Sequence, residues 1–330
     1  MGKGYERMVK MKVLITGSSG YIGSLLVNSW LNNPKIEKIV AIDSQEPKFL
    51  HSKKNPKIQF IKQDVADVDF DEIESGIDAV VHAAYVIRKP YFRSNAKLQE
   101  RSNFEGAENV FNFAFKHNIK KLIHFSTVAV YGANSENSLG RKFIESDPIG
   151  ETIISYGVDK AAIERKLEEL IKNYNPKTQV VSVRLGSVTG PFLKNTVKKS
   201  GLLSYLKAFP FVPVTHDEGA RQFIHEEDVI RAINFFLSKD IGSKYAIFNL
   251  APDGHLTFED IAKLSNKIAL KIPKPIAKFA FNLMWHLSLG KIPSAPGTIN
   301  SYSYPILVDG SKISKLGFKY QYSSKDAFLA

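Results

Sequence analysis

The 330-residue sequence contains no cysteine. This absence excludes disulfide bonds, thiolate metal ligands and a cysteine nucleophile. Long apolar runs are scarce too. The most apolar helical stretch, 276–289, is interrupted by Lys278, Asn282 and His286 and is too short to span a bilayer. We expect it to be a packed helix of a smaller lobe, with contact to a lipid surface as the alternative.

The first ten residues are polar and lack the apolar core of a signal peptide. Acidic residues are fewer than basic ones. The chain has 33 Asp and Glu and 45 Lys and Arg, which gives a net charge of +12. The basic residues are scattered, and no arginine-rich run or RNA-binding motif occurs. A basic surface that attracts anionic substrates is favoured over nucleic-acid binding. We therefore expect a cytoplasmic protein with a small-molecule substrate, no nucleic-acid partner and no membrane span.

Short apolar, β-branched runs alternate with amphipathic stretches through the first part of the chain. The predicted strands are 13–16, 39–43, 58–64, 79–84, 122–127 and 180–185, and the predicted helices between them are 22–31, 98–116 and 160–173. Strands separated by helices require right-handed crossovers. The pattern therefore predicts an α/β protein with a Rossmann-type, doubly wound parallel sheet.

The pattern loosens in the second part of the chain, where prolines and glycines interrupt it. A helix at 226–237 and a strand at 245–250 are expected to return to the sheet. Beyond them, two helical patterns are separated by Pro273 and Pro275. We expect a dinucleotide-binding domain at 11–186 with 225–251 returning to it, and a smaller, mostly helical C-terminal substrate-binding lobe formed by 187–224 and 252–330. The lobe should cover the carboxyl ends of the strands, where open α/β sheets bind ligands.

Three glycines follow the first predicted strand in the segment Thr-Gly-Ser-Ser-Gly-Tyr-Ile-Gly, residues 16–23. Gly17 permits a tight turn, Gly20 lets the backbone approach a pyrophosphate, and Gly23 lets the helix pack against the strand. The start of that helix offers N–H groups to phosphates. Asp43 ends the second strand, where a carboxylate binds the adenosine ribose and repels a 2′-phosphate. Since no arginine follows Asp43, NAD is favoured over NADP.

Tyr156 and Lys160 lie four residues apart, which places both on one face of a helix. A tyrosine has an ordinary pKa of about 10, and a nearby ammonium together with the nicotinamide charge favours its phenolate. Tyr156 could then exchange a proton with a substrate hydroxyl during hydride transfer. Thr127 ends the fifth strand, so it should meet this helix start at the same sheet edge and bind the substrate oxygen. The predicted catalytic residues are thus Thr127, Tyr156 and Lys160.

From Met11 to Phe318 the chain resembles the extended short-chain dehydrogenase/reductases of the NAD-dependent epimerase/dehydratase family. The matching segments are the glycine loop, Asp43, Asp64-Val65, His82-Ala83-Ala84, Asn103-Phe104-Glu105-Gly106, Ser126-Thr127 with Val130-Tyr131-Gly132, Tyr156 with Lys160, Arg184, Gly190-Pro191 and Arg221-Gln222-Phe223-Ile224-His225 with Asp228-Val229. The resemblance implies cofactor contacts from Gly17, Ser19, Gly20, Tyr21, Ile22, Gly23, Asp43, Asp64, Val65, Ala83, Ala84, Asn103, Tyr156 and Lys160. It implies substrate contacts from Tyr85, Thr127, Ser187 and Arg221, and a homodimer formed through helices 98–116 and 160–173.

The chain also departs from the family pattern. The 4,6-dehydratases carry Asp-Glu after the threonine, whereas this chain has Val128-Ala129, which disfavours that reaction. Ser187 stands where epimerases usually have asparagine, and residues 295–298 lack the usual Arg-x-Gly-Asp. Arg221 is present where the family binds a substrate phosphate. The pattern fits either an altered nucleotide-sugar site or a different substrate.

Three functions therefore stay open, two of them enzymatic and one non-catalytic. The leading one is a nucleotide-sugar epimerase-like enzyme that moves hydride at a carbinol. The second is a reductase like the dihydroflavonol reductases or 3β-hydroxysteroid dehydrogenases, because the apolar stretch from Phe279 to Leu287 could hold an apolar substrate or be lobe core. The third is a non-catalytic NAD-binding regulator. His82, His124 and His225 lack metal-ligand spacing, so we expect no metal.

Overall fold

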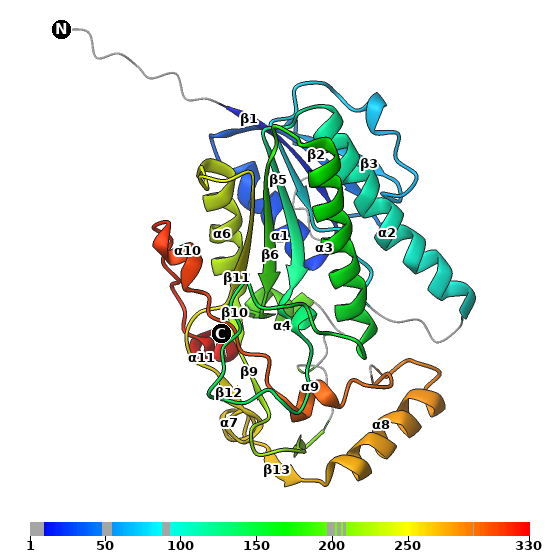
Figure 1. The fold of residues 1–330 in the computed structure, drawn as a ribbon, viewed down its shortest axis with the longest axis vertical. Helices are drawn as coiled ribbons and strands as arrows, with labels where there is room; N and C mark the ends of the chain where they lie inside the picture. The colour runs from blue at the N-terminus through cyan, green and yellow to red at the C-terminus, as the bar shows by residue number, and fades with distance from the viewer. Residues whose placement is uncertain are drawn as a thin grey trace, which may run out of the picture.

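The computed structural model describes residues 10–47, 55–87, 93–196, 202, 206, 209–292 and 294–330. Its centre is a sheet of seven strands in the order β11-β6-β5-β4-β1-β2-β3 (Figure 1). Every neighbouring pair in this sheet is parallel. The strands are β1 (Met11–Thr16), β2 (Ile36–Asp43), β3 (Ile58–Lys62), β4 (Ala79–His82), β5 (Lys121–Thr127), β6 (Gln179–Leu185) and β11 (Tyr245–Leu250). The predicted Rossmann-type fold is confirmed.

The strand order reverses between β1 and β4. From β1 the chain moves outward through β2 to β3, then crosses back to β4 on the other side of β1. In open α/β sheets this reversal leaves a crevice at the carboxyl ends of the strands. Two predicted strand ends were wrong, because β3 ends at Lys62 and β4 at His82. Asp64, Ala83 and Ala84 consequently lie in the loops that line this edge.

Helices cover both faces of the sheet. On one face, α1 (Tyr21–Leu31) and α6 (Glu226–Ser238) contribute to a core that includes Trp30 and Phe236. On the other face lie α2 (Arg93–Lys116) and α3 (Ser155–Tyr174). Both of these helices begin five residues before their predicted starts at 98 and 160.

The smaller lobe has its own apolar core, to which Phe223, Phe258, Phe281 and Tyr302 contribute. Its helices include α7 (Phe258–Leu264), α8 (Lys274–Leu287), α9 (Asn300–Ser303) and α11 (Ser324–Leu329). Pro275 does not separate two helices, as its position had suggested, because it lies in the first turn of α8, where proline is tolerated. The domain boundaries predicted from the sequence, 11–186 with 225–251 and 187–224 with 252–330, stay a proposal.

Short strand pairs that the sequence pattern did not predict run through residues 187–224. The pairs are β7 (Ser187–Thr189) with β10 (Phe223–His225), β9 (Ala220–Arg221) with β12 (Leu256–Thr257), and β8 (Phe211–Val214) with β13 (Ile268–Lys271). Two to four residues are too few to show a strand period. Through β7 and β9 these pairs carry Ser187 and Arg221, two of the predicted substrate residues. Within the described residues, no helix is long and apolar enough to cross a membrane.

Candidate active site

The glycine loop between β1 and α1 is held by contacts that leave no room for side chains. A Cβ on Gly17 would lie 2.5 Å from the backbone nitrogen of Ala84, and Gly17 has a φ of +74°. A Cβ on Gly23 would lie 2.0 Å from the carbonyl oxygen of Gly17. Gly20 precedes α1, and no side chain caps this helix. The loop therefore presents bare backbone and the positive end of α1 to the crevice, an arrangement that suits a pyrophosphate.

Asp43 fixes the glycine loop against the end of β2. Its carboxylate accepts hydrogen bonds from the backbone N–H of Ser19 at 2.9 Å and of Gln45 at 2.8 Å. The Ser19 hydroxyl donates to the Gln45 carbonyl at 2.8 Å. A carboxylate has about four acceptor positions, so two accepted bonds leave capacity for ribose hydroxyls.

Asp64 and Val65 lie in the loop after β3, whereas Asn103 lies in α2. Asp64 accepts from the Ser102 hydroxyl at 2.5 Å and from the Ala66 N–H at 3.0 Å. The side chain of Asn103 is buried, and its Oδ1 accepts from the Val86 N–H at 2.8 Å. Asn103 therefore supports the segment that follows β4. Val65 is buried in the core beside α2.

Tyr21, the first residue of α1, is tied to a buried glutamate that the sequence analysis did not single out. Its hydroxyl donates to Glu226, whose carboxylate also accepts from the N–H groups of Phe192 at 2.8 Å and Leu193 at 3.3 Å. Burial and the glutamate both raise the pKa of Tyr21. This side chain is thus structural, and only the backbone of Tyr21 is available to a phosphate.

Tyr156 lies in the first turn of α3, against the end of β5. A Cβ on Gly157 would lie 2.6 Å from the Ala129 carbonyl oxygen, so glycine is required for this close approach. Glu151 shapes the preceding loop, because its Oε1 accepts from the N–H groups of three successive residues, 152–154, at 2.7–2.9 Å. Together these contacts place Tyr156 beside Thr127, which caps the short 3-10 helix η2 (Val128–Tyr131).

The pKa of Tyr156 is raised by burial, and its hydrogen bond with the Thr127 side chain opposes that shift. The sequence analysis expected a lowered pKa from the neighbouring lysine. In the structure, the Lys160 ammonium instead donates to the Phe125 carbonyl at 2.7 Å. Among the influences from the protein's own residues, burial of the phenol has the largest effect on the pKa of Tyr156.

Lys160 is a buried cation in a confined setting. Its Nζ lies 4.1 Å from the centre of the Tyr85 ring, and that ring packs edge-to-face on Tyr156 with centroids 5.5 Å apart. Burial lowers the pKa of Lys160 to about 7, and the charge of Glu164 opposes the shift. Lys160 can therefore change its protonation state near neutral pH. Tyr85, for which a substrate contact stays a prediction, packs beside the catalytic pair and donates to Asp159 at 3.2 Å.

A buried ion pair supports the helix that carries Tyr156 and Lys160. Glu164, one turn after Lys160, accepts from both Nε and Nη2 of Arg184 on β6, the latter at 2.6 Å. Arg184 also donates to the Tyr131 hydroxyl at 2.8 Å. Because the two charges satisfy each other in this bidentate geometry, they lock α3 to the sheet.

Four of the predicted residues line one cavity of about 280 Å³ between the sheet edge and the lobe. They are Thr127 and Tyr156 from the sheet domain and Ser187 and Arg221 from the short strands of the lobe side. Val128 and Ala129 lie in the same wall. Further lining residues were not predicted as site residues, namely Ile154, Leu185, Gly186, Ala220, Gln222, Ser301, Tyr304 and Ile306. The last three come from a segment whose sequence carries no motif.

Arg221 is held in this cavity by aromatic rings. Its guanidinium carbon lies 5.3 Å from the centre of the Tyr302 ring and 5.9 Å from that of Phe258. Nη2 reaches Ser301 at 3.4 Å, whereas the buried Nε has no hydrogen-bond partner within the described residues. Desolvation lowers the pKa of Arg221, yet arginine keeps its charge at neutral pH.

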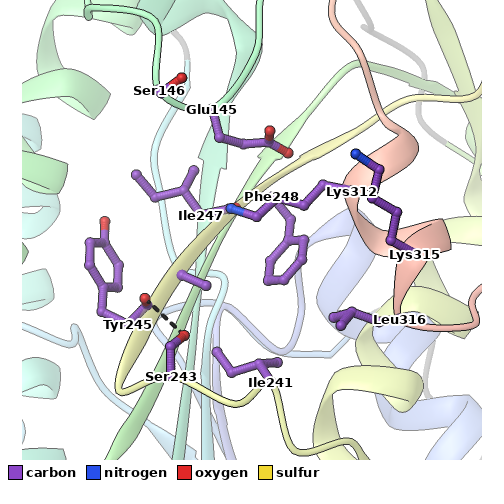
Figure 2. A pocket seen from close by; sticks show the side chains of 11 residues that line it. Glu145, Ser146, Ile241, Ser243, Tyr245, Ile247, Phe248, Lys312, Lys315 and Leu316 are labelled. Atoms are coloured by element: carbon purple, nitrogen blue, oxygen red, sulfur yellow. Dashed lines mark hydrogen bonds between the residues drawn. The ribbon is translucent and has the colours of Figure 1, made fainter.

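A second, larger hollow of about 490 Å³ lies along the outer edge of β11, and none of the predicted site residues borders it. Figure 2 shows Lys312 and Lys315 of α10 (Ser311–Lys315) facing Phe248 and Glu145 there. Glu145 accepts from the Asn249 N–H at 2.9 Å, and Lys312 donates to the Ile247 carbonyl at 2.7 Å. These charged side chains cover part of an edge strand, a common way to protect such edges.

The three histidines considered above as metal ligands, His82, His124 and His225, make packing and hydrogen-bond contacts within the fold. His82 and His124 are buried side by side on adjacent strands, with ring centroids 5.6 Å apart. His82 shares a hydrogen bond with the Thr16 hydroxyl at 2.8 Å. His225 caps α6 and stacks on Tyr322, with ring centroids 3.8 Å apart.

The apolar stretch of α8 does not line the substrate cavity. Phe281 and Trp285 are buried in the lobe, whereas Phe279, Leu283 and Leu287 are exposed. The interpretation of this stretch as a substrate-holding surface was therefore wrong, and its interpretation as lobe core holds for one face of the helix.

Comparison with known proteins agrees with this architecture. A family model described as "NAD dependent epimerase/dehydratase family" matches residues 13–251. The chain is 26% identical over 268 residues to ADP-L-glycero-D-manno-heptose-6-epimerase of Brachyspira hyodysenteriae, a match that spans 78% of this chain and 80% of that protein.

Two solved structures share the fold over nearly the whole chain. One is UDP-N-acetylglucosamine 4-epimerase from Methanobrevibacter ruminantium in complex with UDP-N-acetylmuramic acid, with a TM-score of 0.73, 21% identity and coverage of 98% of this chain and 97% of that one. The other is the Bordetella bronchiseptica enzyme WbmG in complex with NAD and UDP, with a TM-score of 0.70, 23% identity and coverage of 98% and 93%. The chain belongs to the NAD-dependent epimerase/dehydratase family and is an enzyme of the extended short-chain dehydrogenase/reductase type.

Proposed function

We propose that this enzyme binds NAD and inverts a carbinol centre in the sugar of a nucleotide sugar. The observation that carries the proposal is the single cavity that joins Thr127 and Tyr156 to the ring-supported cation of Arg221. The first two residues suit a carbinol, and the third suits a diphosphate. A site with both elements fits a sugar linked to a nucleotide.

The glycine loop and Asp43 fit NAD. Gly17 and Gly23 form a cradle that a Cβ would fill, and α1 begins there without a side-chain cap. Asp43 would accept from the adenosine ribose hydroxyls and repel a 2′-phosphate, which favours NAD over NADP. When bound, NAD supplies a reversible hydride acceptor for the carbinol carbon.

Tyr156 would accept the hydroxyl proton as the carbinol is oxidised and return it as the ketone is reduced. Thr127 would orient the same oxygen by hydrogen bonding. The Lys160 ammonium, in its protonated form, would favour the Tyr156 phenolate through its charge. Inversion then requires that the ketone present its opposite face before reduction.

The wall beside Thr127 limits the chemistry to this redox step. Val128 and Ala129 have no ionisable group, so they cannot remove or add the further protons that a dehydration requires. An epimerase needs no such groups. Epimerisation is therefore favoured over the 4,6-dehydratase reaction.

Arg221 is the residue that we assign to the substrate diphosphate, because it brings a cation to a cavity that lacks a carboxylate among its described lining residues. Ser187 would add one hydroxyl where an asparagine offers two amide donors. UDP sugars are the first substrates to test, since both structural neighbours were solved with a uridine nucleotide.

Replacement of Tyr156 by Phe tests the proposal. Tyr156→Phe should lower kcat for a nucleotide-sugar substrate by at least about 10³-fold while leaving the Kd for NAD nearly unchanged. Tyr174→Phe, at an exposed tyrosine late in α3, is the matched control and should leave both unchanged. Turnover that survives in Tyr156→Phe contradicts the mechanism.

A reductase of an apolar ketone is the second candidate, favoured by the apolar cavity residues Val128, Ile154, Leu185 and Ile306. The retained cofactor distinguishes the two functions. An epimerase regenerates its cofactor in each cycle and should keep NAD through purification. A reductase must exchange its cofactor in each cycle and should lose it on dialysis.

The homodimer through α2 and α3 stays a prediction. Val110, Phe111 and Phe113, which could have supplied its apolar contact, are buried against the sheet. The outer faces carry charges instead, including a 3.1 Å ion pair between Lys166 of α3 and Glu108 of α2. A dimer through these faces would be polar, and its sedimentation should depend on salt.

A further inference from the structure

Helix α8 has two apolar faces, and only one of them is buried. Ala277, Phe281 and Trp285 follow each other at intervals of four residues and face the lobe core. The opposite side exposes a second apolar row, at intervals of three, four and four residues. We call it the outer α8 face, and it consists of Ile276, Phe279, Leu283 and Leu287, which are 60%, 68%, 46% and 77% exposed.

This spacing gathers the four side chains into one stripe along the helix. Single exposed apolar residues are ordinary, but a contiguous stripe marks an interaction surface. The apolar surface continues beyond the helix, where Leu289 and Ile292 are 52% and 40% exposed. In Figure 1, α8 runs along the lower margin of the molecule.

The sequence segment that contains α8 carries charge of one sign. Residues 261–308 contain no Asp or Glu and six lysines. One of them, Lys271, pairs with Glu259 and Asp217 outside the segment. Two others, Lys274 and Lys278, belong to α8 itself. Neither of these two forms an ion pair within the part of the chain that the structure describes. Lys278 is exposed, and Lys274 lies with its Nζ 4.0 Å from the centre of the Tyr304 ring. A helix that has an exposed apolar stripe and carries lysines but no acidic residue resembles the helices that lie in an anionic interface.

We propose that the outer α8 face docks the enzyme on an anionic lipid surface. The helix would lie in the plane of the surface, with Phe279 and Leu283 inserted among the acyl chains and Lys278 among the phosphates. A second copy of this chain is a poorer occupant, because two lysine-rich segments without acidic residues would repel each other. The lipid phosphates supply the negative charge that this segment lacks.

Helix α8 is linked to the substrate cavity through the ring of Tyr302. Its buried residue Phe281 packs edge-to-face on Tyr302, with ring centroids 5.4 Å apart, and Tyr302 supports Arg221. Docking would therefore place the substrate lobe, and not the cofactor half, at the lipid surface. The inference rests on the exposed face and its charge, and it holds whether or not the substrate is a nucleotide sugar.

Flotation of the full chain with lipid vesicles tests the inference. The protein should float with vesicles of equal parts phosphatidylglycerol and phosphatidylcholine, much less with phosphatidylcholine alone, and less at high salt. The double substitution Phe279→Glu with Leu283→Glu should weaken partitioning at least about tenfold. Lys278→Gln should weaken it about fivefold.

The matched control is Leu98→Glu with Leu329→Glu, which adds the same charge at leucines that are 65% and 50% exposed on other helices. It should float like the unmodified protein. Thermal melting of both double variants checks that they are folded. Absence of flotation with anionic vesicles overturns the inference. So does a concentration-dependent dimer that the α8 variant alone disrupts, because a second copy would then cover this face.

Discussion

The cofactor side of the active site is lined by backbone atoms, whereas the substrate side is lined by side chains. On the cofactor side, backbone lies against backbone, and a Cβ on Gly23 would come within 2.0 Å of the Gly17 carbonyl oxygen. On the substrate side, the cavity wall consists of side chains, and Arg221 rests on the rings of Tyr302 and Phe258. The shape of the cofactor side is set by backbone atoms, so side-chain substitutions cannot adjust it. The substrate side is lined by side chains, so single substitutions can change its chemistry while the fold persists.

The largest effect that this comparison predicts is at the glycine loop. Gly23→Ala should abolish measurable NAD binding and lower the free energy of unfolding by more than about 2 kcal/mol, because the added methyl group meets backbone atoms. Isothermal titration with NAD and chemical denaturation measure the two effects. Gly140→Ala is the control, since a Cβ there meets only a serine hydroxyl at 3.9 Å. Normal NAD binding by Gly23→Ala would contradict the claim that backbone contacts fix the shape of the cofactor side.

An intermediate effect is expected at Arg221. Arg221→Met should raise KM for a nucleotide sugar by about 10–100-fold while leaving the Kd for NAD unchanged, because only the substrate side loses a charge. Steady-state kinetics and NAD titration separate the two sides. Arg165→Met, at an exposed arginine of α3, should change neither. An equal loss of NAD affinity in Arg221→Met would show that the two sides are not independent.

The smallest effect is one on stability, and it concerns Lys160, between the two sides. Its pKa is lowered to about 7 in the folded protein from an ordinary value of 10.5, so between these values the unfolded chain binds a proton that the folded chain does not. The contribution of Lys160 to stability therefore rises with pH through this window and is least favourable below pH 7. Lys160→Met should remove this penalty and raise Tm at pH 6 by roughly 2–8 °C, while turnover is lost.

The Tm difference between Lys160→Met and the unmodified protein should shrink as the pH rises toward 10. Lys172→Met, at an exposed lysine of the same helix, controls for loss of a surface charge. Thermal scans across this pH range measure both. A difference that grows with pH has the wrong sign and would contradict the account of Lys160.

The sequence predicted the cofactor half well because its signals are local. The run from Thr16 to Gly23 and the strand that ends at Asp43 carry their own spacing, and each strand of the sheet is long enough to show its apolar character. The predicted ends of β3 and β4 ran two residues too far. After β4, Ala83 and Ala84 continue the apolar run beyond the last paired residue.

The substrate half could not be predicted to the same depth. Strands such as β9, two residues long, have no period, and Ser301, Tyr304 and Ile306 reach the cavity only through tertiary packing. Glu226 looks like an ordinary helix-start acid in the sequence, and its bond to Tyr21 appears only in the fold. The setting of Lys160 was hidden too, because burial and not spacing decides its pKa.

The measurement that tests the central claim most directly is the fate of the hydrogen on the inverted carbon. A UDP sugar deuterated at the carbinol carbon, incubated with the enzyme in ordinary water, should yield an epimer that retains the deuterium at that carbon. Mass spectrometry and NMR of the product report it. Retention is the result predicted for a redox step in the cavity of Thr127 and Tyr156. Washout of the label into solvent would show that the carbon is deprotonated instead, and would contradict the account.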